Sequence, residues 1–262
     1  MRTRRQKLGQ HFLRDARTAH SITAALAGQP PRVLEIGPGD GALTRHLLAR
    51  FSRVRALELD GDLAAMLPGR LGRPATLEVI QGDAVTTDLD ELAAGGPWQV
   101  AANLPYGVGT PIIRRLLPRN DLFTVLLVMV QLEVARRLVA PPGGAERALL
   151  TIEVEAHARA ELLFTVPPRS FSPPPRVHSG VVRLVLQPPP DATVLDRALE
   201  LAAVAFCHRR KKLTNALAAA GRPSELSAAM ERSGVDARVR PQDLTLAQWH
   251  ALAGAMPPEA TA

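Results

Sequence analysis

The tetrapeptide Asn103-Leu104-Pro105-Tyr106 carries residue types that could hold a nucleic-acid base. The apolar residues before Asn103 predict a strand, and Pro105 with the glycines after Tyr106 predicts a tight turn. At such a strand end, Asn103 offers a carbonyl oxygen and an amide, the Leu104 carbonyl is left unpaired by the sheet, and Tyr106 offers a flat aromatic face. Taken alone, the motif also fits an ordinary strand exit, with Asn as a turn former.

A glycine-rich loop, Gly37-Pro38-Gly39-Asp40-Gly41, lies upstream at a predicted junction between strand and helix. Its glycines would let a ligand approach the backbone closely. The spacing through Ala42 also fits a dinucleotide-binding loop, so an NAD oxidoreductase is one alternative. Glu35 favours a different ligand, because a carboxylate there would repel a pyrophosphate but would suit a cofactor that carries ammonium and sulfonium charges.

Two further acids follow the next predicted strands. Glu58 stands at a strand end, where an acid can accept hydrogen bonds from both ribose hydroxyls. Asp83, in Gly82-Asp83-Ala84, is placed to bind an adenine amine, although an Asp after Gly is also a common turn former. With Asn103, these residues predict four successive strands that direct polar groups at one crevice.

The elements that must position these residues alternate between strand and helix from Arg32 to about Leu186, which predicts an α/β fold with a parallel, doubly wound sheet. Leu149–Ala156 is ambiguous, and we interpret it as a helix. The predicted strands are 33–36, 53–59, 76–80, 99–103, 123–130, 161–166 and 178–186, and the predicted helices between them are 43–48, 63–67, 89–93, 111–117 and 131–139.

The amino-terminal arm is basic from Arg2 to Lys7 and ends in apolar residues. Phe12 and Leu13 indicate that the arm docks on the domain, and Asp15 then opens a helical pattern that continues through Leu26. We therefore assign residues 1–187 to one catalytic domain that includes the arm.

The stacked prolines of Gln187-Pro188-Pro189-Pro190-Asp191 predict a linker, because proline neither continues a helix nor pairs inside a sheet. Residues 188–262 then read as a small all-α domain, with helices at 195–206, 211–220, 226–233 and after Thr245. Thr245 and Gln248 form a predicted capping box. The basic cluster Arg209, Arg210, Lys211 and Lys212 in this domain predicts contact with RNA phosphates, the alternative being a solvated helix end.

Composition supports a polyanion binder, because the 262 residues carry a formal charge of +7. The sequence has neither a long apolar run nor a signal-peptide pattern, so we expect a soluble, cytoplasmic protein. Cys207 is the single cysteine, which excludes an internal disulfide and a cysteine zinc cluster, and we expect it to be a small core residue. The histidines show no metal-ligand spacing, so no metal is implied.

Taken together, these motifs resemble the bacterial small-subunit ribosomal RNA adenine dimethyltransferases, the KsgA family. The similarity covers nearly the whole chain and is carried by Gly9-Gln10-His11-Phe12-Leu13, Glu35-Ile36-Gly37-Pro38-Gly39, Glu58-Leu59-Asp60, Gly82-Asp83-Ala84, Asn103-Leu104-Pro105-Tyr106, Phe171-Ser172-Pro173-Pro174-Pro175-Arg176-Val177-His178-Ser179 and Arg209-Arg210-Lys211. The resemblance implies a Rossmann-like, S-adenosylmethionine-dependent methyltransferase fold with a small helical domain.

The resemblance also implies a function: the enzyme dimethylates the exocyclic amines (N6) of two adjacent adenines in the 3′-terminal hairpin loop of small-subunit rRNA during subunit biogenesis. Its partner would be the rRNA of a pre-30S particle, and we expect a monomer. The implied catalytic residues are Asn103, Leu104, Pro105, Tyr106 and Phe171, with Phe171 stacking on the base opposite Tyr106. The implied cofactor-binding residues are His11, Leu13, Glu35, Gly37, Gly39, Glu58, Asp83, Ala84 and Asn103.

Two departures from the family pattern stand out. His11 replaces the usual Asn, and Gly107-Val108-Gly109 replaces Asn-Ile-Ser after the tyrosine. The first is tolerable if position 11 acts through its backbone, whereas the second could loosen the target pocket. A large-subunit rRNA methyltransferase of the resistance type and an RNA-binding assembly factor with weak activity therefore stay as alternatives.

Overall fold

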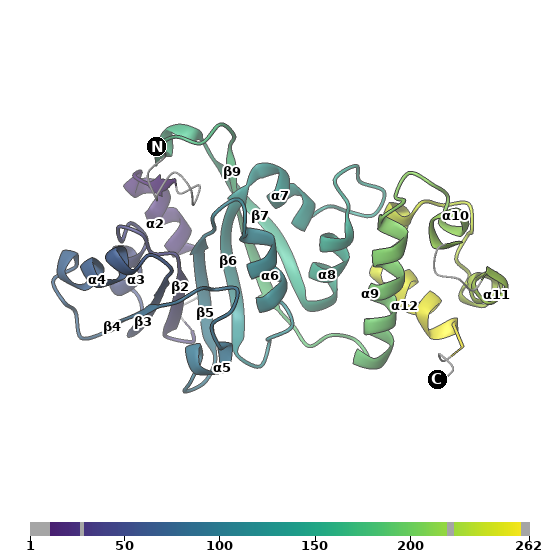
Figure 1. Cartoon of the computed structure of the whole chain (residues 1–262), viewed down its shortest axis with the longest axis horizontal. Helices are drawn as coiled ribbons and strands as arrows, with labels where there is room; N and C mark the ends of the chain where they lie inside the picture. Colours follow the sequence, from purple (N-terminus) through teal and green to yellow (C-terminus); the bar gives the residue numbers. More distant parts are fainter. Residues whose placement is uncertain (1–10, 27–28, 219–222, 258–262) are drawn as a thin grey trace. The chain divides into compact units, whose positions relative to one another are not determined.

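A computed structural model describes residues 11–26, 29–218 and 223–257 of the chain. Its backbone contacts divide the chain into two units (Figure 1). The first unit contains residues 1–136 and 158–187, and the second contains residues 137–157 and 188–262. The division differs from the predicted boundary at 187/188 in one segment, residues 137–157, which groups with the carboxyl-terminal helices.

The first unit is built on a seven-stranded sheet with the strand order β4-β3-β2-β5-β6-β9-β7. Neighbouring residues such as Val33 and Leu34 are both fully buried, which shows that both faces of the sheet are covered. The α/β class predicted from the alternation and the Rossmann-like fold implied by the resemblance are both confirmed. The strands are β2 (Arg32–Ile36), β3 (Arg53–Glu58), β4 (Leu77–Gln81), β5 (Trp98–Asn103), β6 (Phe123–Gln131), β7 (Ala158–Val166) and β9 (Ser179–Leu186).

The expectation of an entirely parallel sheet is wrong at one strand. The five strands from β4 to β6 are mutually parallel, but β9 runs antiparallel to both β6 and β7. The physical reason lies in the connection: residues 167–178 between β7 and β9 contain a 3₁₀ turn and a two-residue strand but no crossover helix, and such a connection allows the chain to reverse.

Three helices of the first unit begin at an aspartate cap. The side chains of Asp15, Asp60 and Asp88 accept hydrogen bonds from backbone N–H groups two residues downstream. One face of the sheet packs against a core that α2 and α3 share, including Ile22, Leu47 and Val54. The helices are α2 (Ala16–Ala24), α3 (Thr44–Leu48), α4 (Gly61–Arg70), α5 (Leu89–Leu92) and α6 (Gly109–Leu116), followed by α7 (Leu132–Leu138) next to the division.

The arm docks, as predicted, through β1 (Phe12–Leu13). This short strand pairs antiparallel with β8 (Phe171–Ser172), so that Leu13 lies opposite Phe171. β8 follows a 3₁₀ turn, η1 (Pro168–Ser170), and Arg14 donates its backbone N–H to the Ser170 carbonyl. The basic residues Arg2–Lys7 lie outside the described residues.

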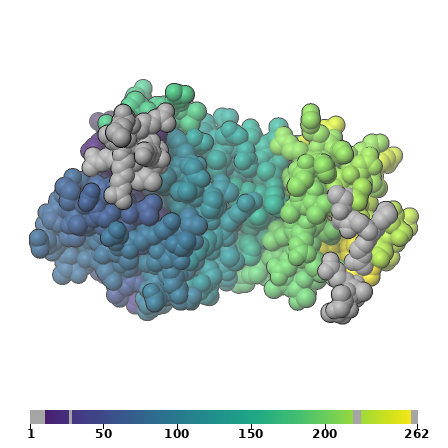
Figure 2. Space-filling view, in the orientation of Figure 1, coloured from purple at the N-terminus to yellow at the C-terminus, as the bar shows by residue number. Residues whose placement is uncertain are grey.

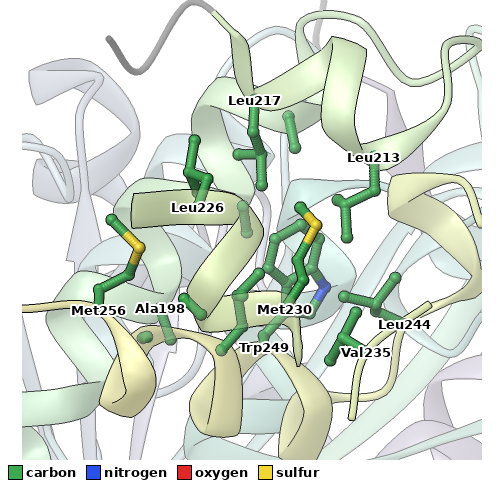
Figure 3. Packing of buried hydrophobic residues seen from close by; sticks show 14 of the residues in the cluster. Ala198, Leu213, Leu217, Leu226, Met230, Val235, Leu244, Trp249 and Met256 are labelled. Atoms are coloured by element: carbon green, nitrogen blue, oxygen red, sulfur yellow. The ribbon is translucent and has the colours of Figure 1, made fainter. Parts of the chain in front are cut away.

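The second unit is helical and packs around Trp249 (Figure 3). The fully buried indole lies among Leu213, Met230 and Leu244. The predicted helix at 149–156 is confirmed, and so is the capping box between Thr245 and Gln248. The elements are α8 (Leu149–His157), α9 (Ala192–Phe206), α10 (Leu213–Leu217), α11 (Pro223–Ser233), η3 (Pro241–Asp243) and α12 (Leu246–Ala255).

A buried arginine explains why residues 137–157 group with these helices. Arg147 is fully buried, forms a bidentate ion pair with Glu155 at 2.6 and 2.8 Å, and also donates to the carbonyls of Ala140 and Leu244. Ile152 of α8 enters the same apolar core as Trp249. Removing either partner of such an ion pair would leave a buried charge without a partner. The contacts of Arg147 therefore hold this segment in the helical unit.

Two expectations about the second unit are wrong. Cys207 is exposed, because it caps the end of α9, where its thiol reaches the Ala203 carbonyl at 3.3 Å. The basic cluster 209–212 forms an exposed turn between α9 and α10, whereas we predicted a helix from residue 211. Residues 219 and 220 of that predicted helix lie outside the described residues. In Figure 2 the light-green to yellow surface belongs to this carboxyl-terminal part of the chain.

Among the described residues, no helix combines the length and the apolar character that a bilayer crossing requires.

Candidate active site

A cavity opens at the carboxyl ends of β2, β3, β4 and β5 in the first unit. β2 has β3 on one side and β5 on the other, which makes this edge the switch point at which ligands bind in open α/β sheets. Every catalytic and cofactor-binding residue proposed from the sequence lines this one cavity: His11, Leu13, Glu35, Gly37, Gly39, Glu58, Asp83, Ala84, Asn103, Leu104, Pro105, Tyr106 and Phe171.

Glu58 fixes the glycine loop to the end of β3. It is almost fully buried, and its two carboxylate oxygens accept the backbone N–H groups of Gly39 and Asp60, each at 3.0 Å. Each oxygen keeps a second acceptor position, so the carboxylate can still bind hydroxyl groups. The carboxylate therefore orders the loop in addition to the ligand role expected from the sequence.

Gly37 and Gly39 of the glycine loop have different roles. Both have positive φ angles, +69° at Gly37 and +57° at Gly39. A Cβ on Gly39 would lie 2.9 Å from the Phe12 ring, whereas a Cβ on Gly37 would approach only the Asn103 carbonyl, at 3.9 Å. Gly39 thus makes room for the docked arm, and Gly37 leaves the backbone open toward the cavity.

Glu35 is a buried acid, and one of its carboxyl oxygens, Oε2, lacks a hydrogen-bond partner among the described residues. Burial, reinforced by the nearby Glu58 carboxylate and opposed by the Thr44 hydroxyl, raises the pKa of Glu35 to about 8. A cation bound beside it would favour the ionised form, so the site suits a positively charged ligand.

Asp83 combines the two roles weighed from the sequence. Its Oδ1 accepts the Val85 backbone N–H at 2.8 Å, as in an Asx turn. No described residue occupies Oδ2. The aspartate can therefore hold its turn and still accept a hydrogen bond from a ligand amine.

Asn103 has a defined orientation at the end of β5. Its side-chain Nδ2 donates to the backbone carbonyl of His11 at 3.2 Å, and this bond assigns the other side-chain atom, Oδ1, as the free acceptor. The N–H of Leu104 is bonded to the Met129 carbonyl, and among the described residues no backbone N–H reaches the Leu104 carbonyl. Two oxygen acceptors therefore stand next to each other at this corner.

Tyr106 is held from two sides. Its hydroxyl lies 3.0 Å from the hydroxyl of Ser179, the first residue of β9, and its ring centroid lies 5.5 Å from that of His11. Burial raises the pKa of Tyr106, and the Ser179 bond opposes that shift, so the phenol stays protonated at neutral pH. The His11 Nδ1 is itself 2.7 Å from the Pro173 carbonyl, which orients the imidazole.

The unusual Gly107-Val108-Gly109 segment forms a closed turn. The N–H groups of Val108 and Gly109 both donate to the Pro105 carbonyl, at 3.1 and 3.0 Å. The turn leads directly into α6, so the backbone after Tyr106 is defined despite the missing family residues.

Phe171 contributes to both the core and the cavity. It is 4% exposed and packs in the apolar core that includes Leu13 and Leu47, and it also lines the cavity wall. The stacking on the base that the resemblance implies for Phe171 stays a prediction.

The sequence reading missed three residues at the site. Ser179 positions Tyr106, and its signal was its place at the end of the Pro-Pro-Pro-Arg-Val-His-Ser stretch. Leu59 is 50% exposed beside Glu58 and offers an apolar surface in the cavity. Phe12 covers Gly39, a contact between residues far apart in the chain that no local pattern could reveal.

The basic cluster 209–212 belongs to the second unit and not to the cavity. Its side chains are exposed, as a contact with a large polyanion requires.

The cavity residues fit S-adenosylmethionine. The orphaned Glu35 oxygen suits an ammonium group, the Glu58 carboxylate retains acceptor positions for ribose hydroxyls, and Asp83 Oδ2 suits an adenine amine. The apolar Leu59 provides a surface for a flat ring. A pyrophosphate would lie beside the Glu58 carboxylate and, unlike a cation, would not stabilise the ionised form of Glu35, which disfavours a dinucleotide.

Comparisons with known proteins agree with this chemistry. Residues 1–256 match the model of the family described as ribosomal RNA adenine dimethylase. A curated relative from Pseudomonas savastanoi, named ribosomal RNA small subunit methyltransferase A, is 41% identical over 256 residues, with 95% of this chain and 93% of the relative covered.

Two solved structures are similar over nearly the full length. A dimethyladenosine transferase from Plasmodium falciparum is 25% identical, with a TM-score of 0.78 and coverage of 92% of this chain and 96% of that chain. The 23S rRNA methyltransferase ErmE is 27% identical, with a TM-score of 0.72 and coverage of 94% and 99%. The chain therefore belongs to the ribosomal RNA adenine dimethylase family, a family of S-adenosylmethionine-dependent methyltransferases.

Proposed function

We propose that this enzyme dimethylates N6 of two adjacent adenines in the 3′-terminal hairpin loop of small-subunit rRNA, within a pre-30S particle. The observation that carries the proposal is the pair of acceptors at the end of β5, Asn103 Oδ1 and the Leu104 carbonyl, which open into a cavity lined by Glu35, Glu58 and Asp83. The particle is assembled in the cytoplasm, where the enzyme would act.

Asn103 and Leu104 act on the target nitrogen. The lone pair of an adenine amine is delocalised into the ring, so the free amine is a poor nucleophile. When the two oxygens accept the amine hydrogens, the nitrogen moves toward tetrahedral geometry and its lone pair becomes available. S-adenosylmethionine supplies the electrophilic methyl group when it is bound. The amine proton becomes acidic only after attack and leaves to water, so the chain provides no general base.

Aromatic residues hold the extruded base. Tyr106, fixed by Ser179 and His11, presents its ring as a stacking surface, and Phe171, which also lines the cavity, would contact the other face of the base. Pro105 stiffens the backbone between the acceptors and the ring. A fixed ring limits the positions that the amine can occupy, which favours productive encounters.

The remaining cavity residues hold the cofactor. Glu35 would face its ammonium group, Glu58 its ribose and Asp83 its adenine amine. The backbone of His11, Gly37 and Gly39 and the side chains of Leu13 and Ala84 complete the walls.

The small subunit is favoured over the large subunit as the source of the RNA. The curated relative that is 41% identical is named for the small subunit, whereas the 23S enzyme is 27% identical. The exposed basic residues 209–212 would hold the RNA backbone.

The test is mass spectrometry of unmethylated small subunits after incubation with the protein and S-adenosylmethionine. We expect two dimethylated adenines in the 3′-terminal hairpin loop. Binding to the particle without methylation would favour the assembly-factor alternative, and methylation of large-subunit RNA alone would overturn the proposal.

The Asn103→Ala variant tests the mechanism in the same assay. Removing a group that acts on the transition state costs about 2.7–4 kcal/mol, a hundredfold or more in rate. Calorimetry should show that the Asn103→Ala variant still binds S-adenosylmethionine. The wild-type protein should bind S-adenosylmethionine and should not bind NAD. Asn120→Ala, in the loop before β6 at the other end of the sheet, is the matched control and should methylate normally.

A further inference from the structure

A second depression lies beside the cofactor cavity, within the first unit. Its walls come from the arm, the glycine loop, α3 and α4, and three of its six lining residues are arginines. The lining residues are Phe12, Arg14, Asp40, Arg45, Leu63 and Arg70. We call this depression the arginine groove.

The arginine groove carries an excess of positive charge. Arg14 is neutralised by Asp40, with Nη1 2.6 Å from Oδ2. Arg45 and Arg70 have no acidic partner within ion-pair distance among the described residues. Two unmatched guanidinium groups therefore face one concave surface, although like charges repel each other.

The arginine groove adjoins the proposed catalytic cavity. Phe12 and Asp40 line both of them, so the two depressions share a wall. A further hollow that contains Arg14, Arg45 and His46 continues the surface along α2 and α3. An anion held by Arg45 or Arg70 would thus lie next to the wall that Phe12 and Asp40 share with the catalytic cavity.

Guanidinium groups select the chemistry of the ligand. Arginine presents a planar fork of donors that matches two oxygens of a phosphate, and exposed arginines commonly position a nucleic-acid backbone without reading its sequence. A base that enters the cavity remains attached to a sugar-phosphate chain, which has to pass over the rim.

We propose that Arg45 and Arg70 bind backbone phosphates of the RNA strand next to the target adenine. This inference rests on the proposed function, and it adds a contact on the first unit to the basic turn 209–212 of the second unit. The sequence reading did not identify it, because the three arginines are far apart in the chain and only the fold groups them.

The experiment compares Arg45→Ala/Arg70→Ala with the wild-type protein on a protein-free transcript of small-subunit RNA. Binding is measured across a salt series. Each phosphate contact contributes about 0.7–0.9 to the slope of log affinity against log salt, so we expect the slope to fall by about 1.4–1.8. Arg14 is retained so that the ion pair with Asp40 stays intact.

The matched control removes the same charge elsewhere. Arg136→Ala/Arg159→Ala takes away two exposed arginines that line none of these depressions. We expect a smaller change of slope in this variant. Equal slopes for the two double variants would overturn the proposal, because the arginine groove would then act only through net charge.

Two further readouts separate other anions from RNA phosphate. Calorimetry with S-adenosylmethionine should give the same affinity for the wild-type and Arg45→Ala/Arg70→Ala proteins, and weaker binding by the variant would reassign the groove to the cofactor carboxylate. A binding defect of the variant that is seen on small-subunit particles but not on the transcript would reassign the arginine groove to an acidic ribosomal protein.

Methylation is measured separately from binding. An inactive wild-type protein would count against the proposed function, whereas a salt slope that is unchanged in Arg45→Ala/Arg70→Ala would overturn only the proposed role of the arginine groove.

Discussion

At the scale of single residues, the site depends on groups that position the proposed catalytic side chains through hydrogen bonds. The Ser179 hydroxyl touches Tyr106 and not the reacting atoms, and the His11 carbonyl holds the Asn103 amide. His11 therefore acts through its backbone on Asn103, which explains how a histidine can stand where the family usually has asparagine. Its ring adds a contact to Tyr106 and a bond to Pro173.

We predict that Ser179→Ala lowers the methylation rate by a factor of about 2 to 12, which corresponds to the net value of one hydrogen bond, about 0.5–1.5 kcal/mol. Tyr106→Phe removes the same bond from the other side. If Ser179 acts by positioning Tyr106, the double variant should be no slower than Tyr106→Phe, and the affinity for S-adenosylmethionine should be unchanged. Additive rate effects in this double-mutant cycle would contradict the positioning role.

Glu35 makes the stability of the ligand-free protein depend on pH. Its pKa of about 8 in the folded chain lies above the ordinary value of 4.5. Between these values the folded state holds a proton that the unfolded state has released, so the free energy of unfolding falls as the pH rises from about 4.5 to about 8.

We predict that Glu35→Gln removes this dependence. Chemical denaturation at several pH values should show that the variant gains stability relative to the wild-type protein as the pH rises, and that the gain levels off above about 8. A constant difference across this range would mean that Glu35 ionises at its ordinary pKa. Thr44→Val is a useful companion, because the Thr44 hydroxyl opposes the shift and its removal should raise the pKa further.

At the scale of elements, the short strand β1 closes the site. It pairs with β8, covers the glycine loop through Phe12 and follows directly on His11, whose carbonyl holds Asn103. Three segments far apart in the sequence, around residues 12, 39 and 171, therefore meet at one wall of the cavity.

We predict that Gly39→Ala loosens this wall. The new Cβ would lie 2.9 Å from the Phe12 ring, and the φ of +57° is strained for alanine. Backbone strain of this kind costs about 1–3 kcal/mol. Hydrogen exchange should show faster exchange at Phe12 and Leu13, together with weaker binding of S-adenosylmethionine.

The matched control for this variant is Gly72→Ala. Its φ is +76°, but a Cβ there meets no atom within 4 Å, so it tests backbone strain without the clash. Exchange at Phe12 and Leu13 that stays slow in Gly39→Ala would show that the Phe12 ring shifts without undocking β1.

At the scale of the whole molecule, the proposed catalytic cavity and the basic turn 209–212 belong to different units of the chain. The cavity lies in the first unit, and the exposed basic turn 209–212 lies in the second. Neutralising the turn should therefore affect the RNA without affecting the cofactor.

We predict that replacing Arg209, Arg210, Lys211 and Lys212 by glutamine weakens RNA binding and flattens its salt dependence, by about 0.7–0.9 for each phosphate that the turn no longer neutralises. Affinity for S-adenosylmethionine should match that of the wild-type protein. Salt slopes on small-subunit particles are the measurement. Parallel slopes would show that the turn is a solvated surface and would leave RNA binding to the first unit.

The sequence alone determined the elements and the chemistry. Strand and helix periodicities, the capping box and the glycine loop are local patterns, and so are the acids at the strand ends. The carboxyl ends of parallel strands lie at one edge of a sheet, which is why the polar residues Glu58, Asp83 and Asn103 could be assigned to one crevice from the sequence.

Only the tertiary structure decided which distant residues touch. The antiparallel β9, the grouping of residues 137–157 with the helical unit through Arg147 and the exposure of Cys207 depend on packing that local patterns do not encode. The same holds for the Ser179 bond to Tyr106 and for the arginine groove, whose members lie on separate elements. Periodicity reports which side of an element is buried, but not what packs against it.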